Sequence, residues 1–278
     1  MDVDEIALGK AGWTLSSSFL ACLSPDRIDE LSNVLLGFSS EFGRLPRTLR
    51  DYQNRVEQLG LSGLRKVLDV GCGSGPWSVA LARENGFVFS TDTDTGRLHT
   101  ARELLLGDKS ANAEVFFAPA ENHSSIGDGS IDGILCHGVF MFTDFASTLS
   151  EWRRVLHSDG VIYVTFNTPR YYFFRLRRRT RVRGMREIRF STTMIARALL
   201  ARRRGALTVR RFQRFVEKSG FRIVGMSKLG SLTAPQTQSS SAVASWGPTA
   251  PGIMEALLAV SGSRTASPNV EPSIHVPE

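Results

Sequence analysis

The feature that most constrains this fold is a glycine-rich turn between an apolar run and a helical segment. Residues 66–70 (KVLDV) suit a buried parallel strand, and Gly71, Gly73 and Gly75 precede a predicted helix at 76–84. Glycine permits a tight turn and the close approach of a ligand, and free N–H groups at a helix start can bind an anionic group. The turn therefore predicts a ligand site, with a plain tight turn as the alternative.

Strand and helix patterns alternate from this turn to residue 224. Further strands are predicted at 86–92, 114–118, 132–137, 161–166 and 220–224. Helices are predicted at 96–106, at 145–156, where Asp159-Gly160 ends the helix, and at 208–219. This alternation predicts an α/β fold with a Rossmann-like, doubly wound and mostly parallel sheet.

The two ends of the chain differ from this core. Residues 1–65 are predicted to form an N-terminal helical cap, with helices at 26–38 and 49–59. Residues 66–230 are predicted as the core, which includes an Arg-rich insert at 170–206 after strand five. Residues 231–278 are predicted as a Ser/Pro-rich tail, whose one candidate edge strand is 242–246.

Charges around the glycine turn discriminate between cofactors. Ser74-Gly75-Pro76 lacks the lysine of a P-loop, and Pro76 occupies the place of the third glycine of a dinucleotide fingerprint. Asp69 would repel a pyrophosphate but would attract a cation. Asp92 ends the second strand, where a carboxylate can accept hydrogen bonds from ribose hydroxyls. Asp94 is a second candidate for the ribose contact. The alternative role for an acid after this strand is to cap the N-terminus of the following helix.

Five segments in this order resemble the class I S-adenosylmethionine (SAM)-dependent methyltransferases. They are VLDVGCGSG (67–75), VFSTDTD (88–94), APAEN (118–122), DGSID (128–132) and RRVLHSDGVIYV (153–164). The resemblance implies SAM as the cofactor, bound at the carboxyl ends of strands one, two and four.

The resemblance also implies individual contacts to this cofactor, all at that edge of the sheet. They are Asp69, Gly71, Cys72, Gly73, Gly75, Asp92, Thr93, Ala120, Glu121, His137 and Gly138. Asp69 would stabilise the loop or reach the ammonium group, and Asp92 would hold the ribose. Ala120 and Glu121 would border the adenine, while His137 and Gly138 would flank the methionine part and the methyl group. Pro119 stands where the family often has an acid that reaches the adenine.

The Arg-rich insert indicates the nature of the acceptor. Residues 170–214 contain sixteen arginines, no lysine and one acid, Glu187, so this segment carries +15 while the chain as a whole carries +7. Charge concentrated in this way indicates an anionic partner. Four aromatic residues (171–174) precede the cluster and could stack on bases, lie at a membrane interface or bind sugars. Tyr171, Tyr172 and Arg175 are predicted as acceptor contacts, and a solvated basic lobe is the alternative.

His137 is the candidate catalytic base because it follows strand four, where an acceptor hydroxyl would meet the methyl group. Its alternative role is that of a wall residue that moves no proton. His99 and His123 are expected at the surface. No metal site is expected, and the three widely spaced cysteines indicate neither a zinc site nor a disulfide framework.

The predicted function is SAM-dependent methylation, at oxygen, of a small-molecule or glycan acceptor that is anionic and phosphate- or lipid-linked. A methyltransferase of RNA or of a nucleic-acid-associated protein is the alternative, and a non-catalytic cofactor-binding module is the third. The sequence has no signal-peptide pattern and no apolar run of transmembrane length. We therefore expect a cytoplasmic enzyme, with peripheral membrane contact as a further option.

Overall fold

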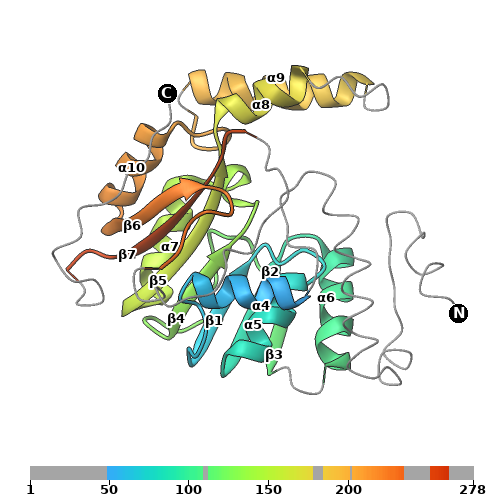
Figure 1. Ribbon diagram of the computed structural model, residues 1–278, viewed down its shortest axis with the longest axis vertical. Coiled ribbons are helices and arrows are strands. Elements are labelled where there is room, and N and C mark those ends of the chain that lie inside the picture. The colour runs from blue at the N-terminus through green and yellow to red at the C-terminus, as the bar shows by residue number, and fades with distance from the viewer. Residues whose placement is uncertain (1–48, 109–111, 178–183, 201, 235–250, 263–278) are drawn as a thin grey trace, which may run out of the picture.

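The computed structural model describes residues 49–108, 112–177, 184–200, 202–234 and 251–262. Seven strands form one sheet in the order β3-β2-β1-β4-β5-β7-β6 (Figure 1). The strands are β1 (Lys66–Val70), β2 (Phe87–Asp92), β3 (Ala113–Phe117), β4 (Ile131–Cys136), β5 (Leu156–Asn167), β6 (Phe221–Lys228) and β7 (Ile253–Val260). The first five strands are parallel and follow the Rossmann order, and β7 is antiparallel to both β5 and β6. The predicted fold class is confirmed.

Helices cover both faces of the sheet (Figure 1). On one face α4 (Leu49–Gln58), α5 (Pro76–Glu84) and α6 (Thr95–Gly107) share a core with the inward side chains of β1 and β2. On the other face α7 (Phe145–Val155) and α10 (Val209–Lys218) share a second core with β4 to β7. Burying both faces accounts for the continuous apolar runs of the strands.

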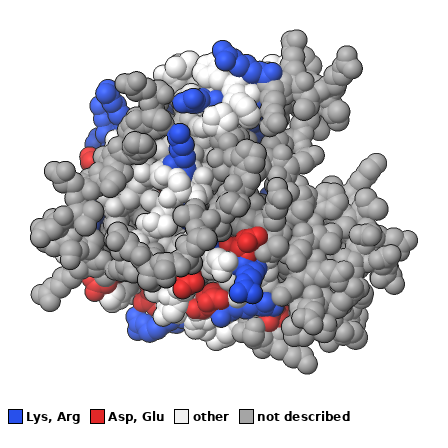
Figure 2. Space-filling view, viewed as in Figure 1, with Lys and Arg blue, Asp and Glu red and all other residues white. Residues whose placement is uncertain are grey.

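The Arg-rich insert forms two helices that pack on each other, α8 (Pro169–Arg177) and α9 (Gly184–Leu199). They lie as a separate layer beyond the carboxyl end of β5, at the top of Figure 1. A third apolar cluster holds this layer on the body, and it includes Tyr171, Tyr172, Met194 and Met141 of the short helix η2 (Phe140–Phe142). Figure 2 shows Lys and Arg side chains over this layer, while Asp and Glu side chains lie lower on the same face, among further Lys and Arg side chains.

The structure corrects the start of the fifth strand. Helix α7 ends at Val155, and β5 begins at Leu156, which pairs with Ile131 of β4. Asp159-Gly160 therefore lies within a strand and does not end the helix. A Cβ at Gly160 would lie 2.6 Å from the Leu156 side chain, so glycine is required there for close packing inside the strand.

The last strand also differs from its prediction. β7 (Ile253–Val260) lies in the region predicted as tail, is buried along its whole length and sits between β5 and β6 instead of at an edge. The predicted strand at 242–246 and the predicted helix at 26–38 lie outside the described residues. The helix predicted at 49–59 is present as α4.

Candidate functional site

The glycine turn lies at the carboxyl edge of the sheet, because it follows β1 and β1 is flanked by β2 and β4. Gly71, Gly73 and Gly75 have φ values of 71°, 58° and 93°, the left-handed region that favours glycine. A Cβ on Gly71 would lie 2.3 Å from Val139, and one on Gly75 would lie 2.9 Å from Ala101. A Cβ on Gly73 would meet no atom within 4 Å. The loop is thus packed at both ends and open in its middle.

Asp92 connects this loop to the end of β2. Its Oδ2 accepts a hydrogen bond from the Gly73 amide at 2.9 Å, and its Oδ1 accepts one from the Asp94 amide at 2.9 Å. Asp94 itself caps α6 by accepting from the Arg97 amide. The helix-cap role therefore belongs to Asp94, and Asp92 faces the loop. Thr93 is exposed between them.

Asp69, which precedes the loop, and Cys72, within it, are buried. Ser78 of α5 donates a hydrogen bond from its hydroxyl to Asp69 Oδ2 at 2.7 Å, which ties β1 to the first turn of the helix. Burial raises the pKa of the Asp69 carboxyl to about 7, because the interior disfavours a negative charge. Burial likewise raises the pKa of the Cys72 thiol.

Glu121 follows β3 and meets the Arg-rich segment. Its Oε1 accepts hydrogen bonds from the Asp144 amide at 2.7 Å and from Arg204 Nη2 at 3.2 Å. Arg203 lies 3.8 Å from the Asp144 carboxylate. Ala120, next to Glu121, is buried. The connection between α9 and α10 therefore reaches the residues predicted to border the adenine, which sequence reasoning did not anticipate.

His137 and Gly138 follow β4 and complete this edge. The His137 ring is half-buried, 5.3 Å from the Trp77 ring and stacked at 6.3 Å on the Tyr163 ring. The Gly138 amide donates to Thr165 Oγ1 at 2.7 Å, and a Cβ on Gly138 would meet nothing within 4 Å. Open backbone therefore occurs after both β1 and β4, which are neighbours in the sheet.

The residues predicted to contact the acceptor lie within or against the α8–α9 layer instead of facing the glycine loop. Tyr171 and Tyr172 are fully buried and anchor α8 to the body, where Tyr172 accepts a hydrogen bond from Asn167. Arg175 is half-buried, and its guanidinium lies over the rings of Tyr171 and Phe190. Burial argues against direct acceptor contact by the two tyrosines, since no part of their surface is open to solvent.

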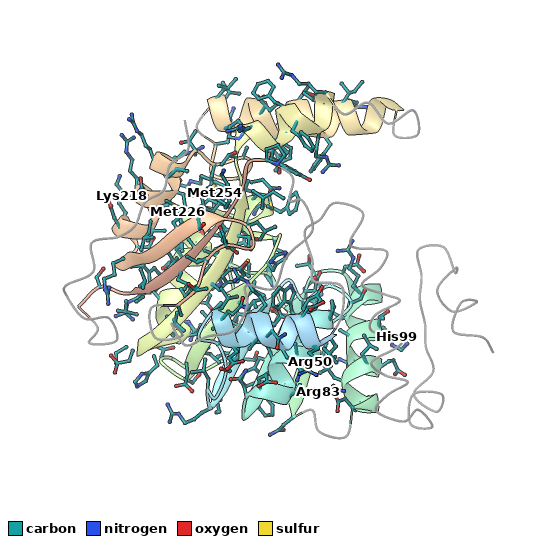
Figure 3. The ribbon with its side chains drawn as sticks, viewed as in Figure 1. Arg50, Arg83, His99, Lys218, Met226 and Met254 are labelled. Atoms are coloured by element: carbon teal, nitrogen blue, oxygen red, sulfur yellow. The ribbon has the colours of Figure 1, made fainter. Side chains whose placement is uncertain are left out.

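His123 is buried, contrary to the expectation that it lies at the surface. Its Nε2 lies 3.3 Å from Thr91 Oγ1 of β2, and burial lowers the pKa of its imidazole to about 4. His99 lies on the outer side of α6 and is half-buried (Figure 3). The position of His123 could not be predicted locally, because its neighbours come from β2 and α7.

Arg154 of α7 is a second feature that sequence reasoning missed. It donates hydrogen bonds to the carbonyl oxygens of His123 and Ile126, at 3.0 and 2.9 Å, and it pairs with Glu151 and Asp128. These contacts fix the segment between β3 and β4, which also carries Ala120 and Glu121. Arg154 belongs to the RRVL segment, but the sequence does not show which backbone it would hold.

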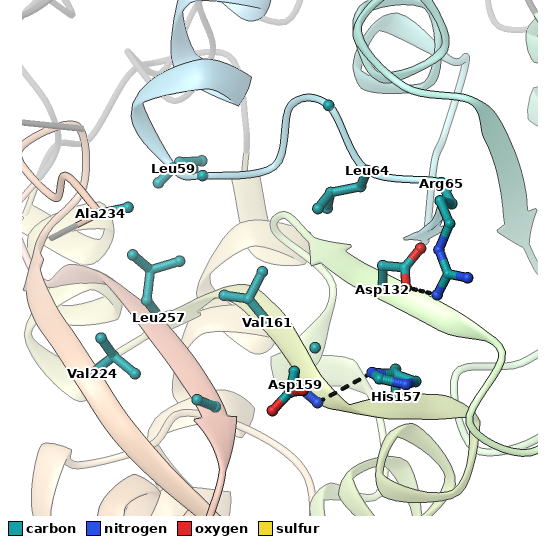
Figure 4. Close-up of a pocket in the computed structure, with 14 residues that line it drawn as sticks. Leu59, Leu64, Arg65, Asp132, His157, Asp159, Val161, Val224, Ala234 and Leu257 are labelled. Carbon is teal, nitrogen blue, oxygen red and sulfur yellow. Dashed lines mark hydrogen bonds and ion pairs between the residues drawn. The ribbon is translucent and has the colours of Figure 1, made fainter. Parts of the chain in front are cut away.

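A cavity of ≈ 360 Å³ lies at the opposite edge of the sheet (Figure 4). Its wall is apolar and comes from Leu64, Val161 and Leu257, while the Arg65–Asp132 ion pair and His157 lie at its rim. Leu64 and Arg65 precede β1, and Asp132 and His157 lie near the starts of β4 and β5, so the cavity is separate from the glycine loop. In the described ranges no cluster of His, Cys, Asp and Glu is arranged to hold a metal ion, and no helix there has the length and apolar character needed to cross a bilayer.

Comparisons with known proteins agree with this geometry. A model of the methyltransferase domain family matches residues 68–164. The chain is 31% identical over 118 residues to the ubiquinone biosynthesis O-methyltransferase of Acinetobacter baylyi, covering 41% of this chain and 49% of that protein. It is 41% identical over 76 residues to the protein-L-isoaspartate O-methyltransferase of Anaeromyxobacter dehalogenans, covering 27% and 32%.

A solved structure of geranyl diphosphate methyltransferase in complex with SAM has a TM-score of 0.52 at 14% identity, covering 90% of this chain and 97% of that one. The family model thus relates residues 68–164 to methyltransferase domains, and the sheet order and the likeness to this structure show the Rossmann-like fold. The chain matches about one third to one half of the length of the two curated relatives, 32% and 49%.

Proposed function

We propose that this chain is a SAM-dependent methyltransferase that methylates a small anionic acceptor at oxygen. The observation that carries the proposal is the open backbone at Gly73 and Gly138, which follow neighbouring strands. The hydrogen bond from the Gly73 amide places the Asp92 carboxylate beside this opening. A phosphate-bearing cofactor fits this edge less well, because the Asp92 carboxylate places negative charge beside the loop.

The residues present fit the proposed cofactor. Side chains at Gly73 and Gly138 would fill space that is open in the structure, so the backbone can be approached closely there. An ionised carboxylate offers about four lone-pair sites, so Asp92 can accept from ribose hydroxyls while it keeps its two amide bonds. When bound, SAM supplies an electrophilic methyl group on a cationic sulfur.

The chain's own residues would then orient the acceptor and move a proton. Methyl transfer is an in-line displacement, so catalysis depends mainly on alignment. His137 lies at the same edge as Gly73, and its imidazole would accept the proton of an acceptor hydroxyl. Arg203 and Arg204 are exposed beside Glu121 and would attract a phosphate or carboxylate of the acceptor. The O-methyltransferase name of the Acinetobacter relative supports oxygen as the acceptor atom.

Calorimetry of the full chain tests the cofactor. We expect SAM and its demethylated product to bind with dissociation constants on the order of micromolar, the ordinary range of small-molecule affinity, and we expect NAD not to bind. Asp92→Ala should weaken SAM binding by about 1–3 kcal/mol, the scale for hydrogen bonds to a charged group. Asp94→Ala is the matched control, because Asp94 caps α6. Binding of NAD without SAM would refute the assignment.

RNA methylation is the second candidate, because the sixteen arginines of residues 170–214 could contact phosphates. Transfer of a labelled methyl group to small phosphorylated, glycan, lipid and RNA acceptors discriminates among these substrates. Transfer to RNA alone would replace the small-acceptor proposal, and SAM binding without transfer to any class would favour a non-catalytic module.

A further inference from the structure

Exposed apolar side chains gather on one layer of the molecule. Among the described residues, seven large apolar side chains are exposed, and five of them belong to or adjoin α8 and α9: Phe142, Phe173, Ile188, Leu199 and Leu200. Phe142 adjoins the layer because its ring packs 6.2 Å from the Phe190 ring of α9. The other two, Leu106 and Phe117, lie on α6 and β3. Leu199 and Leu200 are 80% and 65% exposed, at the end of α9.

The same layer is strongly positive. The exposed arginines among its described residues include Arg170 and Arg177 of α8 and Arg189 and Arg197 of α9. The sequence from 168 to 216 contains one acid, Glu187. In Figure 2 the charged side chains over this layer are blue, while acidic and basic side chains lie together lower on the same face. The layer thus combines exposed apolar groups with a large net positive charge in its sequence.

Helix α9 separates these properties by face. Met194 is buried against the body and Ala198 lies partly buried on the same side. Ile188 and Leu199 lie on the edge of this buried face, in line with the buried Ile195, and are exposed where the helix extends beyond the body. Arg189 and Arg197 are exposed on the remaining side. A solvated basic helix has no need for exposed isoleucine and leucine side chains at its two ends.

We propose that the layer formed by α8 and α9 docks on an anionic lipid surface. Apolar side chains would enter the boundary between headgroups and acyl chains, and arginines would pair with anionic headgroups. A nucleic acid would satisfy the arginines but would leave Leu199 and Leu200 in water. The aromatic pair Tyr171 and Tyr172, which could have stacked on bases, is buried.

The layer is joined directly to the candidate site. Helix α8 begins at Pro169, two residues after β5 ends, and Thr168 is fixed by the bond from its amide to the Gly252 carbonyl. Beyond α9, Arg204 pairs with Glu121. Docking would therefore bring the carboxyl edge of the sheet to the lipid surface. Given the proposed function, an amphiphilic anionic acceptor would reach the methyl donor from that surface.

Co-sedimentation of the full chain with vesicles tests the docking without any turnover. One set of vesicles is phosphatidylcholine alone, and the other contains one quarter phosphatidylserine. We expect binding only to the anionic set, weakened by added salt. Arg189→Gln with Arg197→Gln should weaken binding about 25-fold, since each arginine near such a surface is worth ~1 kcal/mol, or about fivefold. Arg50→Gln with Arg153→Gln, exposed on α4 and α7, is the charge-matched control.

Leu200→Ser tests the apolar contribution, with Leu106→Ser as its control, because the two leucines are 65% and 66% exposed. We expect Leu200→Ser to weaken vesicle binding several-fold and Leu106→Ser to leave it unchanged. Equal binding to both vesicle sets, or loss of binding in the arginine variant only, would overturn the proposal. So would absent vesicle binding together with tight binding of a 20-nucleotide RNA. A chain that docks but transfers no methyl group would refute the proposed function alone.

Discussion

At the scale of single residues, Asp69 is the most perturbed acid of the site. Its carboxyl is buried, and its pKa of about 7 in the folded chain lies above the ordinary value of 3.8. The folded state therefore prefers the protonated form. The associated stability is fully present below pH ~4 and is lost as the pH rises through ~7. A bound cationic ligand would favour the charged form instead.

Asp69→Asn should remove this pH dependence. The amide keeps the shape of the side chain and can accept from Ser78, but it does not ionise. We expect the free energy of unfolding of the wild type to fall relative to that of the variant between pH 5 and 8, because only the wild type acquires a buried charge. Urea unfolding at several pH values measures the difference. If the free energies of unfolding of the two proteins change in parallel with pH, the raised pKa of Asp69 is contradicted.

Variants of His137 distinguish between its two candidate roles, that of a catalytic base and that of a wall of the site. We expect His137→Ala to lower kcat on the order of 10²-fold or more, with little change in SAM affinity, if the imidazole is the base. His137→Phe keeps a ring between Trp77 and Tyr163 but has no nitrogen. It should be as slow as the alanine variant. Turnover retained in the phenylalanine variant would show that His137 only forms a wall.

At the scale of elements, the segment between β3 and β4 depends on α7. Arg154 binds two carbonyl oxygens of this segment and two carboxylates, so its removal leaves those groups without their donor. We expect Arg154→Met to lower stability by about 2 kcal/mol. Hydrogen exchange of amides 118–130 should accelerate, and SAM binding should weaken, because Ala120 and Glu121 lie in this segment.

Arg153→Met is the control for that experiment, since Arg153 is exposed on the same helix. Unchanged exchange of amides 118–130 in Arg154→Met would show that the segment is held by other contacts. A loss of stability without a loss of SAM affinity would show that the Arg154 contacts stabilise the fold but do not shape the candidate site.

Local patterns predicted most elements, and long-range pairing decided the rest. An apolar run followed by glycine located β1, and Asp144 and Thr208 cap the helices expected after them. The place of β7 could not be predicted in this way, because its order in the sheet depends on pairing with β5 about ninety residues earlier. The glycine loop and Asp92 follow from a motif, whereas the Arg204–Glu121 pair joins residues 83 positions apart.

At the scale of the whole molecule, one buried polar network joins the described N-terminal, central and C-terminal elements. Glu255 of β7 accepts at Oε2 from Arg55 of α4 and from the Tyr163 hydroxyl of β5, both at 2.8 Å. Its Oε1 accepts from the amides of Ser231 and Leu232. The Arg55 and Glu255 side chains are fully buried. The carboxylate therefore couples segments separated by up to 200 residues.

Removing one member of this network should destabilise the molecule as a unit. Glu255→Gln leaves the Arg55 cation buried without its anion, and we expect a loss of about 3–5 kcal/mol in the free energy of unfolding. Arg55→Met combined with Glu255→Met should recover part of that loss, because neither charge then remains in the core. Asp132→Asn, which breaks an ion pair with the exposed Arg65, should change the urea midpoint little. Equal shifts of the urea midpoint in Glu255→Gln and Asp132→Asn would refute the role of Glu255 in coupling these elements. A single unfolding transition that moves as a whole would show that the sheet and α4 unfold together.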